Sequence, residues 1–232
     1  MTNLDLVGAL AVGMCGSLIV ALLSVEAGKK AGAVAMFLGG WGLVVAALAA
    51  AGLFTSMQGI GTPAIGAGWL ALIAAGLLLS PTDAGRAVRS IQLPVLTAVQ
   101  TVRVFGILFV ILEWQGRMSG PFGPIAGWGD VFIGATAPLM AWLAARRPQG
   151  SAALLRAWNA LGLLDLVTAV SLGVASAPGS PVRVFTSDPG TEVMGTFAWV
   201  LVPTFLVPVL TLLHLASFRS LAARRVASPA AA

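Results

Sequence analysis

The chain has 232 residues, of which 58% are hydrophobic and 9% charged, and its formal net charge is +5 at pH 7. This composition is typical of an integral membrane protein and excludes an ordinary water-soluble domain. Cys15 and His214 are single residues of their types, which excludes disulfides, thiolate metal clusters, bis-histidine haem sites and HExxH zinc sites within one chain.

Seven apolar stretches are long enough to cross a membrane, since a helix needs about 20 such residues for a hydrocarbon core roughly 30 Å thick. They lie at residues 5–25, 32–54, 64–80, 94–114, 128–146, 155–175 and 194–217. Helices satisfy their own backbone hydrogen bonds in lipid. We therefore predict an all-α, polytopic seven-helix bundle, formed by a single membrane domain over residues 1–232.

Basic residues are distributed unevenly among the loops between these stretches. If the spans alternate in direction, one side has Arg117 and Arg183, and the other side has Lys29, Lys30, Arg86, Arg89, Arg146, Arg147, Arg156, Arg219, Arg224 and Arg225. Cytoplasmic loops keep an excess of positive charge. We expect an external N-terminus and a cytoplasmic C-terminus in the cell membrane, with the lipid bilayer as partner and no nucleic acid.

The first three spans contain few polar residues and many small ones at four-residue spacing, which allows helices to pack closely in lipid. Examples are Ala31, Ala35 and Gly39. We interpret residues 1–80 as a three-helix packing scaffold. Residues 94–217 are predicted to form four helices that carry the buried polar residues.

The span 94–114 places Arg103 about 13 Å from its cytoplasmic end, at 1.5 Å per residue, and close to the bilayer centre. An arginine there costs about 2.5–3.5 kcal/mol on insertion scales and is expected to have a partner inside the bundle. Asp165 lies at nearly the same depth in the span 155–175. Helical periodicity also predicts a polar seam along the arginine's helix, made of Gln100, Arg103, Val110, Glu113, Trp114 and Arg117.

Two interpretations of Arg103 and Asp165 remain open. In the first, they form a buried ion pair that fixes helix register. In the second, they line a polar cavity together with Gln100, Asn159 and Thr168 and bind a small anionic solute, an ion or a proton. The chain has no P-loop, GxSxG or GxGxxG motif, and we expect no cofactor and no metal site.

The Gly- and Trp-rich segment 113–130 is expected to lie along the outer surface or to dip back as a cap. Glu113, Arg117 and Asp130 are candidates for an outer gate. Alternatively, Asp130 caps a helix that begins beside it.

Pro203 and Pro208 predict a bent, deformable last span. Thr204, Thr211 and His214 share one of its faces. Thr211 and His214 are candidates for the inner end of a site, and His214 is expected near the cytoplasmic edge, as an interfacial group or as a proton relay.

The sequence thus favours a transporter or channel for a small solute or ion, with a central Arg103/Asp165 site. The alternative is a non-transporting membrane sensor or assembly protein. A membrane enzyme is less favoured, because the acidic residues are scattered along the chain and not clustered.

Overall fold

The computed structural model describes residues 2–55, 61–147 and 150–226. These residues form helices and no strands, and seven of the helices are long and apolar enough to cross a membrane. The all-helical class and the seven candidate spans are therefore confirmed for this part of the chain. The orientation in the membrane stays a prediction.

The first three spans are α1 (Asn3–Glu26), α2 (Ala31–Ala50) and α3 (Thr62–Leu79). Span 4 is composite: α5 (Leu93–Ala98), a 3₁₀ helix η2 (Val99–Gly106) and α6 (Ile107–Trp114). Spans 5 and 6 are α7 (Phe122–Arg146) and α8 (Ala152–Ser176), and span 7 is the π-helical segment η4 (Val202–Leu206) followed by α9 (Val207–Val226). The connections contain three short helices: η1 (Gly28–Lys30), α4 (Asp83–Arg89) and η3 (Glu192–Gly195).

Helix α7 begins at Phe122 and not near residue 128, and this corrects the expected extent of span 5. Its first two turns are rich in glycine and therefore low in hydropathy, although they are helical and packed. A Cβ at Gly123 would meet Glu113, and one at Gly127 would meet Val110. Asp130 consequently lies two turns inside the helix. The alternative interpretation, in which Asp130 caps the start of this helix, is therefore wrong.

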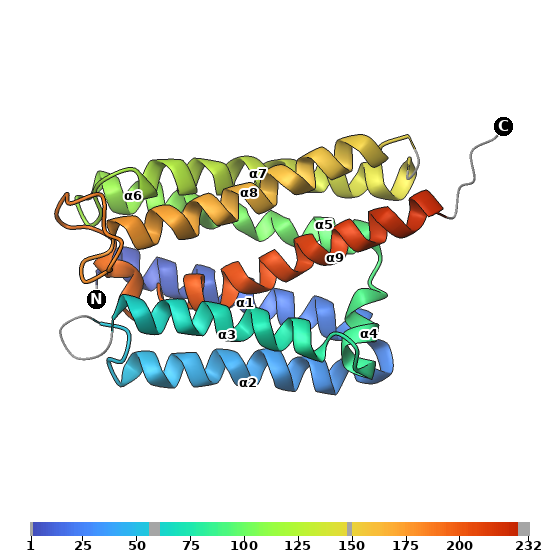
Figure 1. Cartoon of the computed structure of the whole chain (residues 1–232), viewed down its shortest axis with the longest axis horizontal. Coiled ribbons are helices and arrows are strands. Elements are labelled where there is room, and N and C mark those ends of the chain that lie inside the picture. The colour runs from blue at the N-terminus through green and yellow to red at the C-terminus, as the bar shows by residue number, and fades with distance from the viewer. Residues whose placement is uncertain (1, 56–60, 148–149, 227–232) are drawn as a thin grey trace.

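Span 7 crosses the middle of the molecule between two groups of helices (Figure 1). On one side, η4 contacts α1, α2 and α3. On the other side, α9 contacts α5 and α8, while α7 packs against all of span 4 and against α8. The polar centre described below lies in this second group.

A proline near the π-helical segment of span 7 leaves one backbone carbonyl without its usual partner. Pro208 has no backbone N–H, so it cannot donate to the carbonyl of Thr204 four residues earlier. Trp41 of α2 donates its indole N–H to that carbonyl instead, at 2.9 Å. A side chain from a neighbouring span therefore satisfies a backbone group that the proline leaves free.

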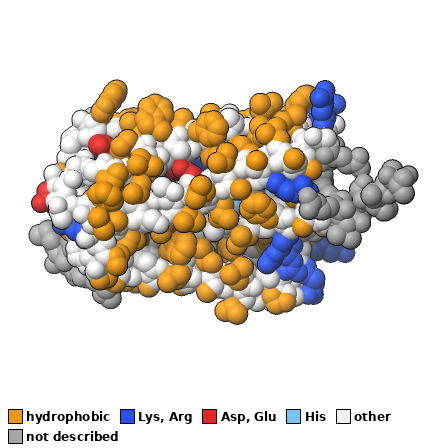
Figure 2. All heavy atoms as spheres, turned by 45° about the horizontal axis from the view of Figure 1, so that its top comes forward, with side chains coloured by type: hydrophobic (Ala, Val, Ile, Leu, Met, Phe, Trp, Pro, Cys, Tyr) orange, Lys and Arg blue, Asp and Glu red, His pale blue; other side chains and the backbone are white. Residues whose placement is uncertain are grey.

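The outer surface of the bundle is apolar along its length and charged at its ends (Figure 2). Large hydrophobic side chains are exposed on the spans, for example Leu43 (73%) and Leu78 (77%). Most basic side chains in this view gather at one end, and one acidic side chain is visible midway along the apolar face. This distribution is the one expected of a helix bundle surrounded by lipid, with one strongly basic rim.

Candidate functional site

The candidate site is centred on the guanidinium of Arg103, in the 3₁₀ part of span 4. Side chains three residues apart eclipse one another in a 3₁₀ helix, so Gln100, Arg103 and Gly106 form one row. All three are buried. A 3₁₀ stretch of this length inside a span is unusual and is typical of a hinge or a strained segment.

Arg103 is held by carboxylates from two different helices. Its Nε donates to Oδ1 of Asp130 on α7 at 2.6 Å. Its Nη2 donates to Oδ2 of Asp165 on α8. Its Nη1 donates to the backbone carbonyl of Gly162, also on α8, at 3.1 Å. The guanidinium thus joins span 4 to spans 5 and 6 through three separate nitrogen atoms.

His214 of α9 completes the group and brings in span 7. Its Nε2 lies 3.2 Å from Nη1 of Arg103. A guanidinium can only donate hydrogen bonds, so this histidine nitrogen accepts, and the proton of the neutral ring is on Nδ1. That nitrogen lies 2.7 Å from Oδ1 of Asn159, which accepts from it. The Asn159 amide then donates to the His214 carbonyl at 3.0 Å.

Glycines make the room for this polar group inside a closely packed bundle. A Cβ at Gly106 would overlap the Asp130 side chain, and one at Gly129 would overlap the Asp165 carboxylate. A Cβ at Gly162 would meet the His214 ring and Nη1 of Arg103, while one at Gly134 would meet the backbone at Arg103. The helices therefore approach closely at the depth where the charged side chains meet.

Two acidic side chains face one arginine in this group. The Arg103 side chain is 1% exposed, and those of Asp130 and Asp165 are 13% and 14% exposed. With both carboxylates ionised and His214 neutral, the group of described residues would carry a formal charge of −1. We refer to Arg103, Asp130, Asp165, His214 and Asn159 as the central group.

The structure thus brings Arg103, Asp165 and Asn159 together. It adds Asp130 and His214, which were expected elsewhere. Gln100 is fully buried beside Arg103 in sequence, and neither atom of its amide has a hydrogen-bond partner among the described residues. Thr168 makes no polar side-chain contact with the described part of the central group. Thr211 donates to the carbonyl of Val207 in its own helix.

His214 is fully buried and lies beside Arg103, whereas it was expected near the cytoplasmic edge, apart from the central pair. Helix α9 continues to Val226, so His214 lies about 18 Å from the helix end at 1.5 Å per residue. The depth of His214 in the membrane stays a prediction.

The three outer-gate candidates do not meet, which corrects the expected grouping. Asp130 is bound to Arg103. Arg117 pairs with Asp5 of α1, with Nη2 to Oδ1 at 2.7 Å, and Trp199 donates its indole N–H to the same carboxylate oxygen at 3.0 Å. Glu113 lies against Gly123.

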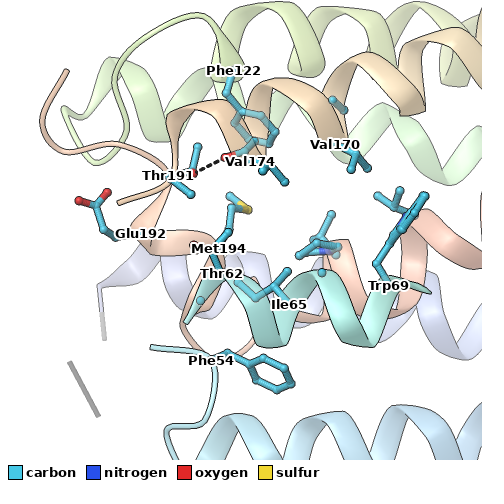
Figure 3. Close-up of a pocket in the computed structure, with 18 of the residues that line it drawn as sticks. Phe54, Thr62, Ile65, Trp69, Phe122, Val170, Val174, Thr191, Glu192 and Met194 are labelled. Atoms are coloured by element: carbon cyan, nitrogen blue, oxygen red, sulfur yellow. Dashed lines mark hydrogen bonds between the residues drawn. The ribbon is translucent and has the colours of Figure 1, made fainter. Parts of the chain in front are cut away.

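A cavity of about 120 Å³ leads from one end of the bundle to Asp130. Ile65 and Trp69 of α3 line one side and Val170 and Val174 of α8 line the other, with Glu192 at one end (Figure 3). A smaller neighbouring cavity of about 50 Å³ is lined by both Arg103 and Asp130. The central group is therefore next to hollow space.

Sequence reasoning missed Asp130 as a partner of Arg103, and it missed the four glycines around the central group. The available signal was Gly129 and Gly134 on either side of Asp130 in one stretch, which suits close helix packing around a polar side chain. Among the described residues, no three His, Cys, Asp or Glu side chains are arranged to hold a metal ion.

Comparison with known families assigns the chain to a family. The model of the family described as "Domain of unknown function (DUF8737)" matches residues 60–222, which is more than half of the chain, so the chain belongs to this family. The matched segment contains every residue of the central group. Searches of curated proteins and of solved structures found no match.

Proposed function

We propose that this member of the DUF8737 family is a transporter or channel of the cell membrane that moves a small solute or ion, with a proton held on the central group. The observation that supports it is the charge count: Arg103 faces the carboxylates of Asp130 and Asp165. Charged residues at mid-membrane are costly and usually lie on ion or proton pathways.

The surplus carboxylate favours a proton or a cation over the small anion that the sequence alone also allowed. An anion would have to compete with Asp130 and Asp165 for the same guanidinium. A proton on either carboxyl would make the group neutral and would preserve its hydrogen bonds, because a protonated carboxyl still has an acceptor oxygen. The 3₁₀ segment that carries Arg103 and the π-helical, proline-containing span that carries His214 are the elements best suited to move.

The test is flux into vesicles that contain equal amounts of folded protein and an internal pH-sensitive dye. We expect the wild type to change proton or solute movement relative to protein-free vesicles, for at least one member of a panel of small anions, cations and amines. Asp130→Asn and Asp165→Asn should reduce that movement to the background, since a side-chain amide does not ionise as a carboxyl does.

Asp188→Asn is the matched control. Asp188 is an acid whose side chain is 80% exposed and pairs with Arg183 in an end loop, so this variant should retain wild-type flux. If the two central variants also retained it, or if the wild type moved nothing in the panel, the proposal would be overturned in favour of a non-transporting sensor or assembly protein.

A further inference from the structure

We propose that the cavity between α3 and α8 binds a lipophilic cation: an apolar body that carries an amine or a quaternary ammonium group. This deepens the proposed function, on which it rests, by naming the class of solute. The argument depends on the shape of the cavity, on its aromatic lining and on the sign of its charged groups.

The cavity runs between one face of α3 and one face of α8, and most of the residues on these two faces are apolar. On α3 the lining residues are Thr62, Ile65, Gly66 and Trp69, and on α8 they run from Ala169 to Val174. These positions recur at the spacing of one helix face. The α8 stretch corresponds to about 7.5 Å at 1.5 Å per residue, a length that suits a short alkyl group.

Four of the described lining residues are aromatic. They are Phe54, Trp69, Phe109 and Phe122. Aromatic faces attract cations, and they do so more strongly where water is excluded. An apolar cavity with several such faces can therefore hold a cationic group as well as a hydrocarbon body.

The charged groups along the cavity are acidic. Glu192 is exposed at one end and Asp130 lies at the inner part. Oδ1 of Asp130 accepts from Arg103, and its Oδ2 accepts no hydrogen bond from the described residues. No lysine or arginine is among the described residues that line the cavity.

The neutral polar groups offer little to an anion. The Thr62 hydroxyl donates to the carbonyl of Pro178, and the Thr191 hydroxyl donates to that of Gly173. The indole N–H of Trp69 has no partner among the described residues, but a neutral donor does not balance a full negative charge. Since Asp130 is paired with Arg103, the carboxylate that remains for a ligand is that of Glu192, and together with the aromatic side chains it favours a cation.

Binding can be tested at equilibrium with the full chain in lipid nanodiscs, using radiolabelled butylammonium as the probe, because its short chain suits a cavity of about 120 Å³. We expect saturable binding above that of empty nanodiscs. Unlabelled butylammonium should displace the label, whereas butyl sulfate, with the same chain and the opposite charge, should not. Equal displacement by butyl sulfate would overturn the proposal, because the site would then select only for hydrocarbon.

Gly66→Leu locates the site. Gly66 lines the cavity, and a Cβ there meets nothing within 4 Å, so a leucine can fill the cavity without displacing the backbone. It should weaken binding by about tenfold or more, as blocked space does in a packed site. Gly40→Leu is the matched control, since Gly40 is equally half-buried in a span, has nothing within 4 Å of its Cβ, and is not part of the lining. Unchanged binding in Gly66→Leu would overturn the proposal.

Glu192→Gln should weaken binding of the cation by about two- to threefold, the effect expected of one exposed charge. The assay needs no gradient, so its outcome is separate from that of the flux experiment. Binding without flux would leave this site standing and overturn transport, whereas flux with no saturable binding would overturn the site alone.

Discussion

Arg103 is bound by carboxylates from two helices, so its loss and the loss of one acid have different consequences. Without the arginine, Asp130 and Asp165 would face each other as buried carboxylates without a cation. Without Asp165, the arginine would keep Asp130. Removing one partner of a buried pair typically costs about 3–5 kcal/mol.

We therefore predict that Arg103→Ala lowers the free energy of unfolding by about 3–5 kcal/mol, and that Asp165→Ala lowers it by less. The measurement is reversible unfolding in lipid-like micelles for each single variant and for the double variant. The double variant should recover part of the loss of Arg103→Ala. Strictly additive losses would show that the two side chains are not coupled.

Asn159 fixes the histidine ring through its amide oxygen, which accepts from Nδ1 of His214. We predict that the ring of the wild type carries its proton on Nδ1, as ¹⁵N chemical shifts of labelled histidine would report. Asn159→Leu should broaden or move these signals, because it removes both hydrogen bonds to His214. A ring protonated only on Nε2 would contradict the arrangement of donors around Arg103.

Part of this site could be predicted from the sequence. Asp165 was predicted as a partner of Arg103 because both lie about ten residues inside their spans. Asp130 was missed because the glycines before it lowered the local hydropathy, and the segment was interpreted as a loop. The contact of His214 with Arg103 was not predicted, because the relative heights of α9 and span 4 depend on how the helices pack, which sequence hydropathy does not report.

At the scale of the helix, close approach at glycine is what allows a charged centre to fit between spans. Gly162 supplies a carbonyl to Arg103 and leaves space for the His214 ring. Gly13 of α1 is also inside a spanning helix, but a Cβ there would meet nothing within 4 Å. The two glycines therefore form a matched pair for testing this role.

We predict that Gly162→Ala destabilises the protein by about 1–3 kcal/mol, as overpacking does. Gly13→Ala should be neutral, or stabilising by up to about 1 kcal/mol, because alanine favours a helix over glycine. Thermal unfolding of the two variants beside the wild type checks this. Equal stability of the two variants would contradict the packing described for α8 and α9.

The π-helical segment of span 7 can be tested through the indole that supports it. Trp41→Phe should cost about 0.5–1.5 kcal/mol in the wild type, the value of one hydrogen bond. In a Pro208→Ala background the same change should cost less, because a backbone N–H at position 208 can then bond to the Thr204 carbonyl. The measurement is a double-mutant cycle on the free energy of unfolding, and a coupling of zero would exclude this explanation.

At the scale of the whole molecule, the seven spans were predictable because each is longer and more apolar than a soluble helix needs to be. Their local forms were not. Span 4 has a 3₁₀ course over Val99–Gly106, and span 7 begins with a π-helical segment over Val202–Leu206. Average hydropathy contains no information about such local forms.

The orientation of the bundle gives a further prediction. In a Cys15→Ser background, a cysteine at Ser187, in the loop before span 7, should react with a membrane-impermeant maleimide applied to intact cells. A cysteine at Ser90, after α4, should react only after lysis. Both side chains are exposed, so access depends on the side of the membrane, and the reverse pattern would contradict an external N-terminus.

The central claim is that one of the two carboxyls bound to Arg103 holds a proton in the resting protein. Infrared spectroscopy of the protein in lipid measures this directly, because a protonated carboxyl has a C=O stretch that a carboxylate lacks. We predict a protonated-carboxyl band in the wild type. The band should disappear in at least one of the variants Asp130→Asn and Asp165→Asn, and it should persist in Asp188→Asn. A spectrum in which neither central variant removes such a band would show that both aspartates are ionised, and it would contradict the claim.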